Sequence, residues 1–144
     1  MTKISRWFIK MGMVYFLLGM FLSFVSELPF LRTGSLLLPV YWHMLVMGWI
    51  TQVIIGVSIW MFPRKRRGQS KKESRLAWFC FWTLNTGLVL RFLSEPFLPL
   101  FQGDLVITIT VIFSSALQVL AVIFYVAEIW PRVQPKKKRK RETV

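Results

Sequence analysis

The chain has 144 residues, of which 55% are hydrophobic, and it combines a mean hydropathy of +0.53 with a formal net charge of +13. Soluble domains average roughly 45–50% apolar residues, so this composition is shifted towards that of a protein facing lipid. The basic residues flank long neutral stretches, which argues against a nucleic-acid-binding domain. The single cysteine, Cys80, excludes an internal disulfide and a CxxC metal or redox motif.

Four stretches of the chain are long and apolar enough to cross a bilayer, for which ~20 apolar residues are needed. They are residues 7–26, 40–62, 76–97 and 105–130. The first is too long for a signal peptide and lacks a small-residue cleavage pattern, so we expect it to be retained. The sequence therefore predicts an all-α integral membrane four-helix bundle over residues 1–132, followed by a basic tail over residues 133–144.

Basic residues mark one side of the predicted membrane. Lys3 and Arg6, the segment 63–75 and the tail fall on one side of a four-span chain, and the sparse acidic connections fall on the other. Short cytoplasmic loops carry an excess of lysine and arginine. We therefore expect both termini in the cytoplasm, membrane lipid and no nucleic acid as partner, and a location in the inner membrane of a prokaryote.

The only histidine, His43, lies about three residues into the second span. Ionisable groups inside a bilayer are costly and are therefore functional candidates, although a neutral imidazole bonded to a neighbouring helix is the alternative. At ~100° per residue, Met47 shares the face of His43 and Gln52 lies on the opposite face. Gly48, Gln52 and Gly56 form a stripe of small and polar residues, which is typical of helices that pack closely in lipid.

The third span carries a second unusual residue, Arg91. At ~1.5 Å per residue, Arg91 lies roughly 8 Å and His43 roughly 5 Å below the outer end of their spans. The two share a layer with Glu27, Glu95 and Asp104. Arg91 either pairs with Glu95 at i, i+4 or extends towards the interface, or it binds an anionic group beside His43.

The segment 39–63 reads PVYWHMLVMGWITQVIIGVSIWMFP. It resembles a metal-binding helix of the haem-copper oxidase subunit I superfamily, which includes cytochrome c oxidases and nitric oxide reductases. The shared features are the position of an H-x-H element at the outer side, two glycines and a terminal aromatic-Phe-Pro. The third span adds a helix containing NTGLVLR at 85–91. The specific likeness covers about a sixth of the chain.

The resemblance implies that His43 is an axial ligand of a low-spin haem, of the b type. Tyr41 stands at the position of the family's earlier histidine, Met47 lies beside His43, and Arg91 is the expected partner of a haem propionate. The chain lacks the further histidines that a haem-copper centre requires, so we do not expect it to reduce oxygen by itself.

Four spans with the ligand on the second helix look like one of the three four-helix arcs of subunit I. Since an isolated arc leaves its concave face open, a closed homo-oligomer is expected, a trimer first and a dimer second. In either assembly, His43 side chains from two copies would be able to ligate one iron.

The expected roles are respiratory electron transfer, gas sensing or assembly of a respiratory complex. A rival hypothesis is a cofactor-free accessory subunit that docks through the stripe of Gly48, Gln52 and Gly56. A third is copper handling through His43, Met44 and Met47, because imidazole and thioether groups suit copper.

Overall fold

A computed structural model of the chain describes residues 1–28, 34–62, 74–101 and 103–133. Within these ranges the structure is helical and contains no strand. Helix α1 covers Lys3–Ser26, and α2 (Gly34–His43) continues through a π-helix, η1 (Met44–Ile50), into α3 (Thr51–Met61). The second half consists of α4 (Arg75–Ser94) with a short 3₁₀ turn, η2 (Glu95–Phe97), and α5 (Leu105–Ile129) with η3 (Trp130–Arg132).

Side-chain caps fix where three of the helices begin. Thr2 accepts a hydrogen bond from the backbone N–H of Ser5, Ser74 accepts one from Ala77, and Asp104 accepts bonds at the start of α5. Such caps satisfy backbone donors that have no partner within the helix. All three stand just before the apolar runs, so each apolar run begins at a capping residue.

The four predicted long apolar helices are confirmed. In the part of the chain that the structure describes, four helices are long and apolar enough to cross a membrane: Lys3–Ser26, Leu36–Met61, Arg75–Phe97 and Leu105–Arg132. They differ from the expected ranges only by a few residues at the ends. The chain thus has the helices of a multi-pass membrane protein. Nearly all of the expected basic tail and of the basic segment 63–75 lies outside the described residues.

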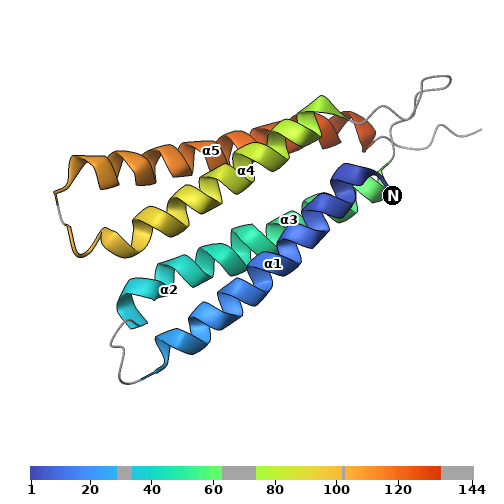
Figure 1. Ribbon diagram of the computed structural model, residues 1–144. Helices are drawn as coiled ribbons and strands as arrows, with labels where there is room; N and C mark the ends of the chain where they lie inside the picture. The colour runs from blue at the N-terminus through green and yellow to red at the C-terminus, as the bar shows by residue number, and fades with distance from the viewer. Residues whose placement is uncertain (29–33, 63–73, 102, 134–144) are drawn as a thin grey trace, which may run out of the picture.

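The helices form two antiparallel hairpins (Figure 1). Within each hairpin, glycines lie where the two helices contact each other. In the first hairpin, a Cβ atom at Gly48 would lie 2.7 Å from the Tyr15 ring, and one at Gly56 would lie 3.0 Å from Phe8. In the second, a Cβ atom at Gly87 would lie 3.1 Å from the carbonyl oxygen of Ser114. Glycine therefore lets the backbones approach closely, as is common between helices in lipid.

This packing shows which helices the predicted stripe of Gly48, Gln52 and Gly56 contacts. Gly48 and Gly56 face α1, and Gln52 is fully buried between α3 and α4. The stripe is used inside the chain, so it is not the surface by which a rival accessory subunit would dock to another protein.

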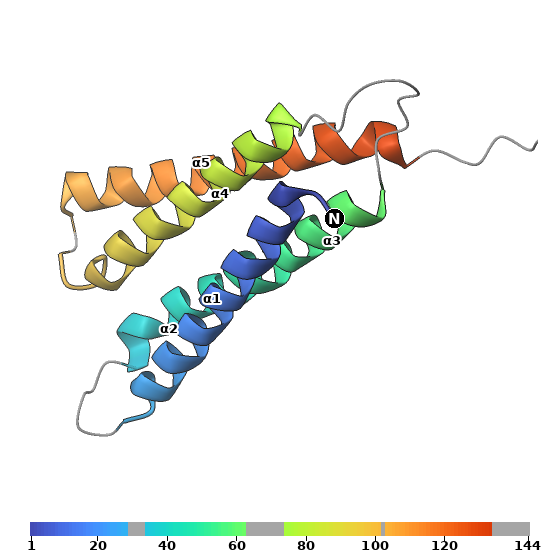
Figure 2. The same ribbon diagram turned by 45° about the vertical axis from the view of Figure 1, so that its right-hand side comes forward.

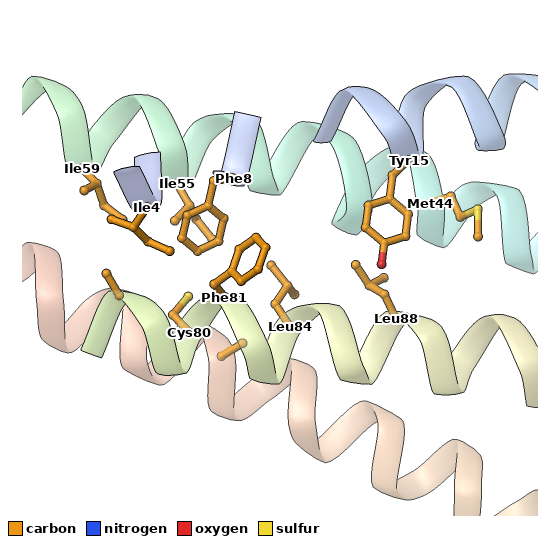
Figure 3. Packing of buried hydrophobic residues seen from close by; sticks show 12 residues of the cluster. Ile4, Phe8, Tyr15, Met44, Ile55, Ile59, Cys80, Phe81, Leu84 and Leu88 are labelled. Atoms are coloured by element: carbon orange, nitrogen blue, oxygen red, sulfur yellow. The ribbon is translucent and has the colours of Figure 1, made fainter. Parts of the chain in front are cut away.

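The two hairpins meet along an apolar core (Figures 1–3). Phe8 of α1 and Phe81 of α4 pack edge to face, with ring centroids 5.2 Å apart. Leu84 and Ile55 are buried beside them, and Tyr15 reaches from α1 towards Leu88 (Figure 3).

Polar contacts also join the hairpins at three depths. At the end where α3 stops and α4 begins, Arg132 donates to the carbonyl oxygen of Phe62 at 3.1 Å and forms an ion pair with the buried Glu128. In the middle, Gln52 Nε2 donates to Asn85 Oδ1 at 3.1 Å. At the opposite end, His43 Nδ1 lies 3.1 Å from Glu95 Oε2. Such bonds hold helices together where lipid supplies no partner for polar groups.

The expectation that His43 and Gln52 lie on opposite faces is wrong, because both contact the third span: His43 lies against Glu95 of η2, and Gln52 bonds to Asn85 of α4. The cause is the π-helix Met44–Ile50 that separates them. Its i→i+5 hydrogen bonds place more residues in each turn, so the chain lags the α-helical phase by roughly 100° over this segment. The lag turns His43 towards the side that Gln52 occupies.

Candidate functional site

The ring of His43 is held from one side. Its Nδ1 atom lies 2.8 Å from the carbonyl oxygen of Pro39, one turn earlier in α2, and 3.1 Å from Glu95 Oε2. Pro39 O accepts the hydrogen bond of the Nδ1 proton, whereas Glu95 Oε2 lies at ion-pair distance and accepts no hydrogen bond from the described residues. A neutral imidazole with its proton on Nδ1 carries its lone pair on Nε2. No partner for Nε2 lies among the residues that the structure describes.

Glu95 joins this histidine to the third and fourth spans. Its side chain is 9% exposed, and its second oxygen, Oε1, lies 3.2 Å from Arg91 Nε. Arg91 in turn donates through Nη1 to the hydroxyl oxygen of Ser115 on α5. A buried carboxylate is costly unless it is paired, and here it is neighboured by an imidazole and a guanidinium. The result is a connected polar cluster of four side chains from three spans.

The predicted shared depth of His43, Arg91 and Glu95 is confirmed by these contacts. The i, i+4 pairing of Arg91 with Glu95, one of the two alternatives, is also present. Of the other residues assigned to this layer, Asp104 caps α5 by accepting from Val106. Glu27 stands at the end of α1.

Ser115 is the member of the cluster that the sequence did not reveal. Serines within spans commonly bond to the backbone of their own helix, and Ser115 also donates to Val111 at 3.0 Å. Its place on the side of α5 facing Arg91 depends on the rotation of one helix against another. No local pattern in the sequence records that rotation.

The two remaining candidates, Tyr41 and Met47, make other contacts. The Tyr41 ring stacks on that of its neighbour Trp42, with centroids 6.1 Å apart. Met47 packs against the hydrophobic core, and its sulfur lies 3.8 Å from the hydroxyl oxygen of Thr51.

The donors available for a metal are few. Met44, the third residue of the copper hypothesis, is 4% exposed within the hydrophobic core. The described ranges contain no group of three or more His, Cys, Asp or Glu side chains able to hold a metal ion. What His43 offers is a single oriented nitrogen, which suits an axial ligand better than a protein-only metal centre.

Comparisons of the chain with protein-family models, with curated proteins and with solved structures give no match.

Proposed function

We propose that the chain is a haem-binding membrane protein in which Nε2 of His43 is an axial ligand of the iron. The observation that carries the proposal is the placement of Nδ1 between Pro39 O and Glu95 Oε2. Histidines that ligate metals almost always donate their other ring N–H to a carbonyl or a carboxylate, which fixes the tautomer and the ring orientation. His43 has the carbonyl acceptor in Pro39 and a carboxylate, Glu95, at ion-pair distance.

The residues around His43 fit such a group in part. Arg91 is engaged with Glu95 and Ser115 through Nε and Nη1, and its Nη2 has no partner in the described part of the chain. That nitrogen is the one suited to a haem propionate, since guanidinium groups bind carboxylates through charge-assisted hydrogen bonds. When bound, a b-type haem supplies one-electron transfer or gas binding, and this chain supplies ligand, orientation and counter-charge.

The proposed location is the inner membrane of a prokaryote, with both termini in the cytoplasm. The basic residues in the first turn of α1, and at the sequence positions between α3 and α4 and after α5, support this orientation. It places His43 and Arg91 near the external surface.

The proposal also includes a second copy of the chain. The full sequence has one histidine, so a haem with two imidazole ligands requires His43 from two copies. A closed homo-oligomer, a trimer first and a dimer second, provides this arrangement. Electron transfer within a respiratory assembly, or gas sensing, is the corresponding role.

The test is the absorption spectrum of protein purified in mild detergent from cells with adequate haem. We expect a Soret band and, after dithionite reduction, the α-band of a b-type haem. The band should be lost in His43→Ala and kept in the matched aromatic variant Tyr41→Phe.

Three results would contradict the proposal. Colourless wild-type protein would leave a cofactor-free accessory role, and a metal analysis showing copper bound without haem would assign His43 to that ion. A Soret band that survives in His43→Ala would show that the haem has a different ligand.

A further inference from the structure

The exposed face of α1 changes character along its length. Arg6 and Lys10, both exposed, occupy its first turns, and large exposed apolar side chains follow at helical spacing. This face, called the α1 face below, consists of Arg6, Lys10, Met13, Leu17, Phe21 and Phe24. From Met13 to Phe24 it rises ~16 Å, about half of the ~30 Å hydrocarbon thickness. Cations at one end and a half-bilayer of apolar surface above them match the shape of one phospholipid.

An aromatic cluster between α1 and α4 lies beside this face. The Trp7 ring lies 6.5 Å from Phe81, whose ring lies 5.7 Å from Trp82. Trp7 is 49% and Trp82 is 61% exposed, so both rings face outward beside the place where the two helices meet. Arg75, at the first residue of α4, adds an exposed cation at this end. Tryptophan is enriched at the level of lipid headgroups.

These cations lie where the chain as a whole is most basic. Helices α1 and α4 begin, and α3 and α5 end, at the same end of the bundle (Figures 1 and 2). The segment that joins α3 to α4 reads PRKRRGQSKKES in the sequence. At the opposite end, in contrast, stand Glu27, Glu95 and Asp104.

We propose that the α1 face, together with Trp7, Trp82 and Arg75, is a binding site for an anionic phospholipid. Its phosphate-bearing headgroup lies beside Arg6 and Lys10, Arg75 adds positive charge at the same end of the bundle, and one acyl chain runs along the apolar part of the face. Lys10 lies one turn deeper than Arg6 and reaches the headgroup level by extending its side chain towards the interface.

A lipid fits this surface better than a protein or a nucleic acid. A nucleic acid would cover cations that are grouped without apolar side chains directly beside them, whereas here Met13 and Leu17 follow immediately. The cations also lie at the predicted boundary of a membrane-spanning helix, where headgroups are the nearest anions.

The experiment uses full-length protein reconstituted in phosphatidylcholine containing a varied fraction of brominated phosphatidylglycerol, with quenching of tryptophan fluorescence as the readout. We expect quenching at low fractions of the anionic lipid, and weaker quenching when the brominated lipid is phosphatidylcholine. The variant R6Q/K10Q/R75Q should lose this preference. Since each cation at an anionic surface contributes a factor of roughly five, the loss in relative affinity is expected to reach roughly 100-fold.

The matched control replaces the six basic residues at 136–141, near the C-terminus, by glutamine, which removes more charge than the triple variant does. It should retain most of the preference. If the tail variant loses the preference and the R6Q/K10Q/R75Q variant keeps it, or if wild-type protein shows none, the assignment is overturned.

Two measurements on wild-type protein keep the test decisive even if the triple variant fails to fold. The preference should fall at 1 M salt, where charges are screened over ~3 Å, and a preference unchanged at 1 M salt would count against a site built on cations. Inorganic phosphate should fail to displace the lipid, because the apolar part of the face contributes to binding. Efficient displacement by phosphate would show an ion site in place of a lipid site.

Discussion

Deletion of Val46 tests whether the π-helix places His43. Val46 lies within Met44–Ile50, and its carbonyl oxygen accepts the hydrogen bond of the Thr51 N–H, five residues on. Removing one residue from this segment allows continuous α-helical bonding and takes ~100° out of the helix, which offsets the ~100° lag of the π-helix, so the direction of His43 relative to Gln52 is nearly unchanged. Removing Ile50 as well leaves no lag to offset and rotates everything before it by ~100° relative to Gln52. The side-chain ends of a helix lie ~5–6 Å from its axis, so this rotation displaces the His43 ring by roughly 8 Å. A contact of 3.1 Å with Glu95 does not survive such a shift.

The assay is a double-mutant cycle between His43→Ala and Glu95→Ala, measured by unfolding in mild detergent. Interhelical hydrogen bonds in membrane proteins contribute ~0.6 kcal/mol on average, and charge-assisted bonds are stronger, so we expect a coupling free energy of about 1 kcal/mol. The coupling should be kept when Val46 alone is deleted and should fall to about zero when Val46 and Ile50 are both deleted. Val46→Ala is the matched control, because it removes the same exposed side chain without changing the register. Loss of the coupling after the single deletion, or an undiminished coupling after the double deletion, would refute the explanation.

Two further predictions concern the packing around this site. Gly48→Ala places a methyl group 2.7 Å from the Tyr15 ring, so we expect a loss of about 1–3 kcal/mol in the free energy of unfolding. The control Thr86→Ala, at an exposed position on α4, should be nearly neutral. Equal effects of the two substitutions would contradict the packing. Gln52→Leu leaves Asn85 Oδ1 without its donor, and we expect a loss of about 1 kcal/mol that Gln52→Leu/Asn85→Leu largely recovers; additive losses in thermal unfolding would argue against the bond.

The sequence predicted the spans because length and hydropathy are local properties. The pairing of Arg91 with Glu95 was also accessible, since it depends only on the i, i+4 spacing within one helix. The sequence did not reveal which helices the stripe of Gly48, Gln52 and Gly56 contacts. A small-residue stripe indicates close packing, but it does not record whether the packed helix belongs to the same chain, and here it does.

The π-helix corresponds to a spacing pattern in the sequence that can be recognised only once the structure is known. Val40, Met44, Gly48 and Gln52 are all buried, at a constant spacing of four residues. An α-helix repeats every 3.6 residues, so a spacing of four would drift across its surface. In the π-helical segment the drift is removed, and the four residues face the protein interior together. Glycine and glutamine are weak markers of burial, which is why the pattern did not stand out.

The sequence therefore predicts the depth of a residue in a span more reliably than the direction in which its side chain points. The depth of His43 follows from the rise per residue, and local errors in helix type change it by only a small fraction of the span. Its direction follows from the turn angle, and a single additional residue changes that by ~100°. A polar residue in a membrane span can thus be assigned to the correct layer and to the wrong side. At His43 the side decides the chemistry, because only the side facing α4 brings its Nδ1 to Glu95 and leaves Nε2 as the donor atom.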